Sequence, residues 1–274
     1  IGTSLGLSIG TGVFEQAVND PITVKKIFIT GASSGLGAAL ALEFANETII
    51  LGLLSRRVKV LQQVSKEFTG KVYCYGADVG DPVEVRNAAE SFMESVGVPD
   101  IVIANAGISA GTDTSLVEDQ GVFERIMRTN VLGMVHTFQP FLSAMSQRGS
   151  GSLVGISSIA GFRGIPGSGA YSASKAAATS YLESLRVELS LSGINVLTVC
   201  PGYIRTPMTD VNHFYMPFLI NAESAAASIV KAINKKKRFH VVPWQMAVIG
   251  FLLRLLPRAL YDFLFRRAPR KPRV

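Results

Sequence analysis

Tyr171 and Lys175 stand four residues apart at the start of a helical pattern and could form an acid–base pair. Residues at positions i and i+4 share one face of a helix. A phenol has a reference pKa of about 10, and a neighbouring ammonium favours the phenolate, so the pair could exchange a proton. A core tyrosine beside a lysine that reaches solvent would show the same spacing. Ser157 and Ser158 end an apolar run upstream and offer hydroxyls that could stabilise developing charge.

A glycine-rich segment, TGASSGLG at residues 30–37, lies between a strand-like run and a helical pattern. Its glycines permit a sharp turn and a close approach to a pyrophosphate, and the helix that follows offers free N–H groups. A glycine cluster between a strand and a helix indicates a phosphate site more strongly than an isolated cluster does. The alternative is a tight turn that binds nothing. The expected contacts are Gly31, Ser33, Ser34, Gly35, Leu36 and Gly37.

Short apolar runs alternate with helical patterns from about residue 24 onward. The expected strands span residues 25–30, 48–54, 71–76, 100–104, 152–157, 194–200 and 239–242. The expected helices span residues 36–46, 58–68, 82–96, 121–145, 171–191 and 222–234. This alternation predicts an α/β fold of the Rossmann type, a doubly wound, mostly parallel seven-stranded sheet with helices on both faces. Ligands of such sheets bind beyond the carboxyl ends of the strands.

Three further motifs follow successive strands in the expected places. Asp78 follows the third strand, Asn105-Ala106-Gly107 follows the fourth, and Pro201-Gly202 follows the sixth. Together with the TGxxxGxG spacing of residues 30–37, they resemble the short-chain dehydrogenase/reductase family over about residues 25–242. The motifs occur in the family's order, which makes the resemblance more specific than one loop would.

The family's catalytic tetrad of Asn, Ser, Tyr and Lys has a counterpart here. The family places its serine thirteen residues before its tyrosine, which favours Ser158 over Ser157. The resemblance implies that Tyr171 exchanges a proton with the substrate oxygen and that Ser158 hydrogen-bonds the same oxygen. It also implies that Lys175 binds the nicotinamide ribose and lowers the pKa of Tyr171. Asn130 would hold its helix and a water molecule that links Lys175 to solvent.

The end of the second strand, LLSRR at residues 53–57, bears on the choice of cofactor. NAD-specific sites place an acid here to accept hydrogen bonds from the ribose 2′-hydroxyl, whereas a guanidinium pairs with the 2′-phosphate of NADP(H). We therefore expect NADP(H) to be preferred over NAD(H), with Arg56 as the main phosphate partner and Ser55 and Arg57 as secondary ones. A solvated helix start would also explain the two arginines.

The resemblance implies further cofactor contacts after the later strands. Asp78 would contact the adenine ring and Thr206 the nicotinamide amide, with Ile204 as a weaker backbone contact. The remaining expected contacts are Val79, Asn105, Ala106, Gly107, Tyr171, Lys175, Pro201 and Gly202.

These features predict an NADPH-dependent reductase, or reversible dehydrogenase, that transfers hydride between nicotinamide and a carbonyl or alcohol. Largely apolar loops at residues 159–170 and 203–220 favour a lipophilic substrate, although such loops also pack as core or at interfaces. The expected walls are Phe162, Ile165, Pro166, Met208, Phe214, Tyr215, Met216, Phe218 and Leu219. An NADP(H)-binding, membrane-associated regulatory or scaffold protein without turnover is the alternative, and the complete tetrad argues against it. Members of the family commonly form dimers or tetramers through the helices after the fourth and fifth strands. The resemblance therefore implies a homodimer or homotetramer.

The net charge of +7 is unevenly distributed. Residues 231–274 hold twelve basic residues and one acid, whereas residues 1–230 hold fifteen basic and nineteen acidic ones. A mildly acidic body argues against nucleic-acid binding as the main function. The expected regions are an N-terminal arm at residues 1–20 with no assignable role, a catalytic domain at 21–243 and a basic amphipathic tail at 244–274.

The tail could lie on a membrane or pack on protein. Arg254, Arg258, Asp262 and Arg266 recur every fourth residue and make one polar stripe on an otherwise apolar helix, which Pro257 is expected to kink. Such a helix suits in-plane binding to an anionic membrane. Packing on the body or across an oligomer interface is the alternative, and nucleic acid is a weaker one. No stretch is long and apolar enough to span a bilayer. The expected location is cytoplasmic, with the inner face of a membrane as an option.

Cysteines and histidines predict neither a disulfide nor a metal. Cys74 and Cys200 lie in apolar strand-like runs, where buried free thiols of a reduced protein are expected. The three histidines, His136, His213 and His240, share no metal-ligand spacing with one another or with the cysteines.

Overall fold

The structure, a computed structural model, describes residues 24–45 and 48–273. The expected N-terminal arm, residues 1–20, lies outside these residues. The described strands form one sheet in the order β3-β2-β1-β4-β5-β6-β7. They are β1 (Lys25–Thr30), β2 (Ile49–Ser55), β3 (Lys71–Gly76), β4 (Ile101–Ala104), β5 (Gly151–Ile156), β6 (Ile194–Pro201) and β7 (Phe239–Val242). All neighbouring pairs are parallel, so the predicted doubly wound sheet is confirmed, and it is wholly rather than mostly parallel.

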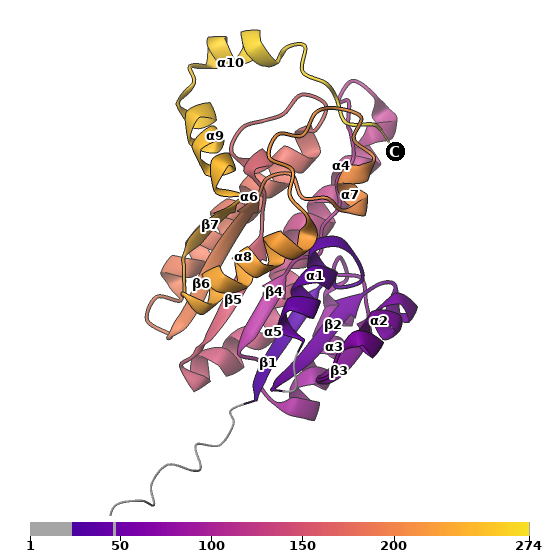
Figure 1. The fold of residues 1–274 in the computed structure, drawn as a ribbon, viewed down its shortest axis with the longest axis vertical. Helices are drawn as coiled ribbons and strands as arrows, with labels where there is room; N and C mark the ends of the chain where they lie inside the picture. The colour runs from indigo at the N-terminus through magenta and orange to yellow at the C-terminus, as the bar shows by residue number, and fades with distance from the viewer. Residues whose placement is uncertain (1–23, 46–47, 274) are drawn as a thin grey trace, which may run out of the picture.

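Helices cover both faces of this sheet, as Figure 1 shows. One face packs against α1 (Gly35–Phe44), α2 (Val58–Val64) and α8 (Ala222–Asn234). The other face packs against α3 (Pro82–Val96), α5 (Gly133–Arg148) and α6 (Gly169–Glu188). Successive side chains of a strand point to opposite faces, and Ile27, Phe28 and Ile29 of β1 are all fully buried. A sheet covered on both sides thus explains why its central strands are apolar at nearly every position.

Of the thirteen expected elements, five have the expected boundaries, six are shifted by one to three residues at an end, and two helices divide. β1, β3, β7, α3 and α8 begin and end at the expected residues. The expected helix at residues 58–68 divides into α2 and a 3₁₀ turn, Ser65–Glu67. The expected helix at residues 121–145 divides into α4 (Gln120–Met127), a π-helical turn (Arg128–Leu132) and α5.

Short turns at the carboxyl edge of the sheet hold segments that the sequence analysis treated as loops. A 3₁₀ turn, Ile159–Gly161, follows β5, and another, Val117–Asp119, precedes α4. The short helix α7 (Pro207–Asp210) follows β6, and Thr206 forms a capping box with Thr209 at its start. These turns give defined structure to the segments that follow the strands and border the candidate site.

The tail forms two helices and then returns to the body. α9 (Trp244–Leu255) and α10 (Arg258–Phe265) are separated at Pro257, the residue expected to kink a single helix. Beyond α10, the Gly111 N–H donates to the Pro272 carbonyl over 2.9 Å. The tail therefore packs on the body at its end, one of the alternatives considered. None of the helices in the described residues is long and apolar enough to cross a membrane.

The two cysteines differ in burial. Cys200 is buried in β6 as expected, whereas Cys74 is only half-buried. The expectation for Cys74 is wrong because β3 is an edge strand of the sheet, where cover is incomplete. Burial raises the pKa of both thiols, that of Cys200 to about 11.

Candidate active site

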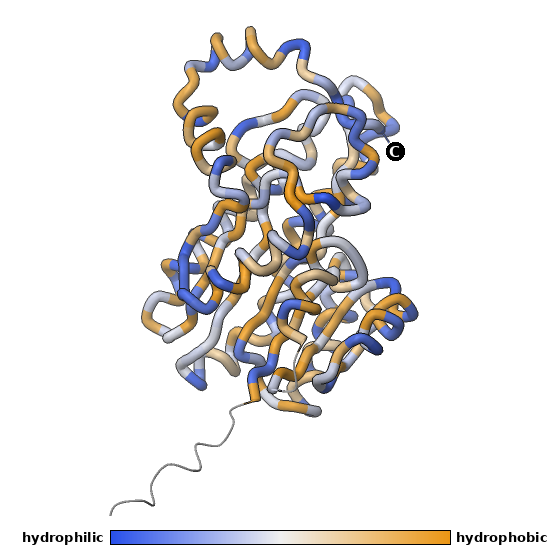
Figure 2. Tube along the Cα trace, in the orientation of Figure 1, coloured by the Kyte–Doolittle hydropathy of each residue, from blue (hydrophilic) through white to orange (hydrophobic). Residues whose placement is uncertain are grey.

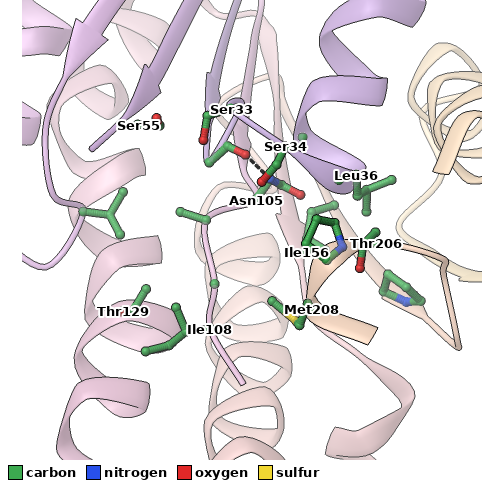
Figure 3. Close-up of a pocket in the computed structure, with 18 of the residues that line it drawn as sticks. Ser33, Ser34, Leu36, Ser55, Asn105, Ile108, Thr129, Ile156, Thr206 and Met208 are labelled. Atoms are coloured by element: carbon green, nitrogen blue, oxygen red, sulfur yellow. Dashed lines mark hydrogen bonds between the residues drawn. The ribbon is translucent and has the colours of Figure 1, made fainter. Parts of the chain in front are cut away.

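A cavity of about 370 Å³ opens at the carboxyl edge of the sheet, where the strand order reverses between β1 and β4. Ligand sites of doubly wound sheets lie at this point. Figure 3 shows side chains from the loops after β1, β4 and β6 around one space. Every residue that we expected to bind the cofactor or to take part in catalysis lines this cavity, with Asn130 as the exception.

The glycine loop after β1 packs directly on the segment after β4. Gly31 has a φ of 69° and Gly35 a φ of 55°, in the region that favours glycine. A Cβ on Gly31 would lie 2.7 Å from the Cα of Ala106, and one on Gly37 would overlap the Gly31 carbonyl oxygen. Side chains are therefore excluded, and the backbone itself forms the wall of the cavity.

Asn105 holds the shape of this loop, and α1 presents free backbone N–H groups beside it. The Asn105 side-chain amide donates to the carbonyls of Thr30 (3.1 Å) and Gly31 (3.2 Å), which fixes the turn. No side chain caps α1 at Ser34, so the first N–H groups of the helix are available to a phosphate. A dinucleotide pyrophosphate fits this cradle of backbone donors.

Arg56 and Arg57 leave the end of β2 in different directions. The Arg57 guanidinium donates to the hydroxyls of Ser33 (2.9 Å) and Ser34 (2.6 Å) on the glycine loop. Arg56 instead lies 3.8 Å from the carboxylate of Asp78 and is largely exposed. The structure therefore places Arg57 against the phosphate loop, whereas the sequence analysis ranked Arg56 first.

Ser55 and Asp78 shape the same end of the cavity by holding local turns. The Ser55 hydroxyl accepts the N–H of Arg57 over 3.0 Å, and the Asp78 carboxylate accepts the N–H of Gly80 over 2.9 Å. Val79 is buried beside them. The residue that ends β2 is thus a serine, not the acid that would favour a free ribose 2′-hydroxyl.

Tyr171 and Ser158 both line the cavity and share a hydrogen bond. Tyr171 lies in the first turn of α6, and Ser158 follows β5. Burial raises the pKa of Tyr171, and a hydrogen bond with Ser158 partly offsets that rise. The phenol is therefore protonated at neutral pH, which is the form that donates a proton to a carbonyl oxygen.

Ser157 points away from this pair. Its hydroxyl donates to the Lys175 carbonyl over 2.8 Å and lies 2.7 Å from the hydroxyl of Thr179. It thus ties β5 to α6, and the geometry favours Ser158 as the serine that faces a substrate.

Lys175 is buried one turn further along α6. Its Nζ donates to the Ile156 carbonyl over 2.8 Å and lies 5.8 Å from the centre of the Tyr171 ring. Burial lowers the pKa of Lys175 to about 8. The expected lowering of the Tyr171 pKa by Lys175 is not found, because burial raises that pKa and it is the hydrogen bond with Ser158, not Lys175, that opposes the rise. Lys175 lines the cavity and remains in reach of ribose hydroxyls.

Asn130 stands behind the cavity wall rather than in it. It lies in the π-helical turn, a feature often found at functional sites. Its amide oxygen accepts the N–H of Ile108 over 2.8 Å, and its amide nitrogen donates to the Ile108 carbonyl (3.0 Å) and the Ser174 hydroxyl (2.9 Å). Asn130 therefore joins the loop after β4 to the helix that carries Tyr171 and Lys175.

Several lining residues were missed by sequence reasoning. They are Ala77, Ile108, Thr129, Ile156, Pro207 and Thr209. Each lies beside a residue or motif that the sequence analysis named, so extending those motifs by a residue or two would have found them. Among the apolar substrate walls that we expected, Met208 is the one that lines the cavity within the described residues.

Phe162 corrects the expected substrate wall. Its ring stacks on Phe239 with centroids 6.3 Å apart, and the Arg254 guanidinium lies 4.3 Å from its centre. Phe162 therefore docks the tail on the body instead of facing the cavity.

The end of the tail approaches the opening of the cavity, which the sequence did not reveal. The Lys271 ammonium donates to the Ser109 hydroxyl and to the Met208 carbonyl, both over 3.1 Å. Arg273 makes hydrogen bonds of 2.9 and 3.0 Å to the buried Asp119, which lower the pKa of that carboxyl. The tail thus connects the loop after β4 with α7.

Comparison with known proteins agrees with this geometry. A sequence model described as short chain dehydrogenase matches residues 25–213. An uncharacterized oxidoreductase of Myxococcus xanthus (strain DK1622) is 36% identical over 254 residues, which cover 90% of this chain and 98% of that protein. The ketoacyl reductase HetN of Nostoc sp. (strain PCC 7120) is 34% identical, covering 86% of this chain and 84% of that protein.

A solved structure shows the same fold. It is a short chain dehydrogenase/reductase from Burkholderia phymatum in complex with NAD, with a TM-score of 0.76 at 22% identity, covering 92% of this chain and 99% of that chain. The chain therefore belongs to the short-chain dehydrogenase/reductase family and is an oxidoreductase.

Proposed function

We propose that this protein reduces a carbonyl group of a lipophilic substrate with NADPH, in a reaction that is reversible. The observation that carries the proposal is the Ser158–Tyr171 pair beside buried Lys175, at the inner end of a cavity whose outer end meets Arg57. The nicotinamide cofactor, when bound, supplies the hydride.

The residues of the chain handle the proton and the developing charge. Ser158 and Tyr171 both offer hydroxyl hydrogens to the substrate oxygen, which gains negative charge as the carbonyl is reduced. Tyr171 then donates its proton, which its raised pKa keeps in place until that charge develops. Lys175, at the Ile156 carbonyl, orients the ribose and lies near enough to stabilise the phenolate left on Tyr171.

The preference for NADP(H) rests on the end of β2. Ser55 leaves room where an acid would repel a 2′-phosphate, and the guanidinium of Arg57 already spans two hydroxyls of the glycine loop. A phosphate there would accept charge-assisted hydrogen bonds from that guanidinium.

Arg57→Ala is expected to raise the KM for NADPH about 10- to 100-fold and to leave the KM for NADH nearly unchanged, because hydrogen bonds to charged groups contribute about 1.5–3 kcal/mol. Steady-state kinetics with both cofactors measure this. Arg56→Ala tests the order in which the sequence ranked the two arginines, and Arg186→Ala, on the far half of α6, is the matched control. An equal loss for NADPH and NADH in Arg57→Ala would contradict a phosphate-binding role.

The lipophilic substrate is supported by Ile108, Ile156 and Met208, which line the inner cavity. The name of HetN, a ketoacyl reductase, fits a carbonyl on an acyl chain. A panel of 2- and 3-keto compounds of increasing chain length, followed by NADPH absorbance, tests both activity and substrate class. We expect KM to fall as the chain lengthens. No turnover across the panel by a protein that binds NADPH would favour a binding or scaffold role instead.

A further inference from the structure

The outward face of α9 is apolar although it faces solvent. Its residues recur at helical spacing and are between 50% and 70% exposed. They are Trp244, Val248, Phe251, Leu252 and Leu255. A surface helix normally presents polar residues on this side. Packing among residues 24–45 and 48–273 therefore does not account for the stripe.

A different set of α9 residues packs on the body. Met246 is buried against Gly202, and Gly250 lies beneath the ring of Phe162. The helix thus packs on the body without its exposed stripe, which contacts little else in the part of the chain that the structure describes.

α10 also carries exposed apolar side chains. Leu260, Phe263 and Leu264 are 45% to 61% exposed. On the other side, the Tyr261 hydroxyl donates to the Gly164 carbonyl over 2.7 Å, which holds the helix on the body. Figure 2 shows α9 and α10 as a mostly hydrophobic arc at one end of the molecule, broken by short hydrophilic segments.

Positive charge accompanies this arc. Arg258, Arg266 and Arg267 are exposed on or beside α10. Asp262 is the one acid in residues 244–267. The Arg266 guanidinium lies 4.6 Å from the centre of the exposed Phe263 ring, so cationic and apolar side chains meet on α10. Such a pairing complements a surface that is apolar inside and anionic outside.

We propose that the exposed face of α9 and α10, defined by the eight apolar residues above and by Arg258, Arg266 and Arg267, binds in the plane of an anionic lipid bilayer. A second copy of the chain is a poorer occupant, because a symmetric contact through this face would bring the arginines of both copies together. Lipid headgroups instead pair with them, and the acyl region accepts the apolar side chains.

The face is held in place from both ends. α9 follows β7 directly, and beyond α10 Arg273 binds Asp119 over 2.9 and 3.0 Å. The chain between these anchors lies at the end of the molecule to which the strands point (Figure 1). Beyond α10, the Lys271 ammonium donates to the carbonyl of Met208, which lines the cavity, so docking of this face would bring the cavity near the bilayer. The benefit for a lipophilic substrate rests on the proposed function, whereas docking itself does not.

Vesicle flotation of the full chain tests the proposal. Wild-type protein is expected to float with vesicles of phosphatidylcholine and phosphatidylglycerol and to bind weakly to phosphatidylcholine alone. The triple variant Phe251→Gln, Leu255→Gln, Phe263→Gln should lose binding to both. The triple variant Arg258→Gln, Arg266→Gln, Arg267→Gln should lose the preference for anionic vesicles, on the order of 100-fold in partition coefficient.

A matched control separates this face from general surface hydrophobicity. Val83→Gln, Val187→Gln, Leu191→Gln removes three other exposed apolar side chains, on α3 and at the far end of α6, and should float like wild type. Equal loss in this control, or flotation of the apolar triple variant, would overturn the proposal. So would a wild-type protein that stays with the buffer, or an apolar triple variant whose only change is a smaller oligomer in size-exclusion chromatography.

Activity on a short, water-soluble carbonyl distinguishes this proposal from the proposed function. The apolar and arginine variants should both retain wild-type turnover in the absence of vesicles, because none of their residues lines the cavity. A protein that floats but shows no reductase activity would leave docking in place and refute the proposed function.

Discussion

The Tyr171→Phe variant is expected to lose about 10²- to 10⁴-fold in kcat, the usual contribution of a positioned acid or base. The substitution removes the one proton that the site holds ready beside Ser158, and it leaves the ring in the first turn of α6. Because the phenol hydroxyl is not needed to hold the glycine loop, the affinity for NADPH should change less than threefold. Stopped-flow or steady-state assays with an active carbonyl measure kcat, and fluorescence titration measures NADPH binding.

Tyr181→Phe is the control for this variant. Tyr181 lies on the same helix ten residues later, packs on the core beside the sheet, and does not line the cavity. Its variant should keep wild-type kcat. If Tyr171→Phe turned over carbonyls at a near-normal rate, the assignment of Tyr171 as the proton donor would be refuted.

The fold was predictable because its signals are local. The central strands of a sheet covered on both faces must be apolar at almost every position, so the runs that form β1, β2 and β4 are visible without any knowledge of their neighbours. The glycines at 31 and 35 are required by the backbone itself, and their spacing reveals the loop. Residues that line the cavity follow strands directly, so strand ends alone indicated them.

The parts that were not predictable depend on contacts between distant segments. Both Arg56 and Arg57 carry the same charge, and only the position of Ser33 and Ser34 after folding favours Arg57. The π-helical turn around Asn130 spans five residues between two α-helices, too short a segment to give a period of its own.

The contacts of Phe162 and of the tail also join distant segments, and the sequence did not predict them. The hydrophobicity of Phe162 predicted that its ring would be buried. It did not predict that helix α9, rather than a substrate, would bury it. The return of the tail to the body depends on the ion pair between Arg273 and Asp119, which are 154 residues apart. Sequence periodicity carries no information about such a pair.

The sequence identified Lys175, but only the structure shows that its ammonium is buried at a cost in stability. Its spacing from Tyr171 identified it, yet its side chain is almost completely buried and its pKa falls from 10.5 to about 8. A difference of this size means that holding the ammonium in the folded protein costs about 3 kcal/mol at neutral pH. The site therefore keeps a cation where stability alone would remove it, as functional sites often do.

Lys175→Met is expected to abolish most activity and at the same time to raise stability. The variant removes the buried charge, and it leaves the Ile156 carbonyl without its donor, a loss of about 1 kcal/mol. The net gain is therefore about 2 kcal/mol at pH 7, which corresponds to a rise in Tm of about 4–8 °C for a chain of this size. Because the ribose contact and the cation beside Tyr171 are both lost, kcat/KM should fall at least 100-fold.

The pH dependence of this gain separates charge burial from better packing. Between pH 8 and 10.5, the folded wild-type protein binds fewer protons at Lys175 than the unfolded chain does, so its stability rises with pH. The advantage of Lys175→Met should thus be complete below about pH 8 and shrink towards pH 10.5. Lys175→Arg keeps a charge that the protein cannot discharge, so it should be inactive without any gain in Tm. A Tm advantage of Lys175→Met that stayed constant from pH 7 to 10 would show that burial of the ammonium is not the source of the instability.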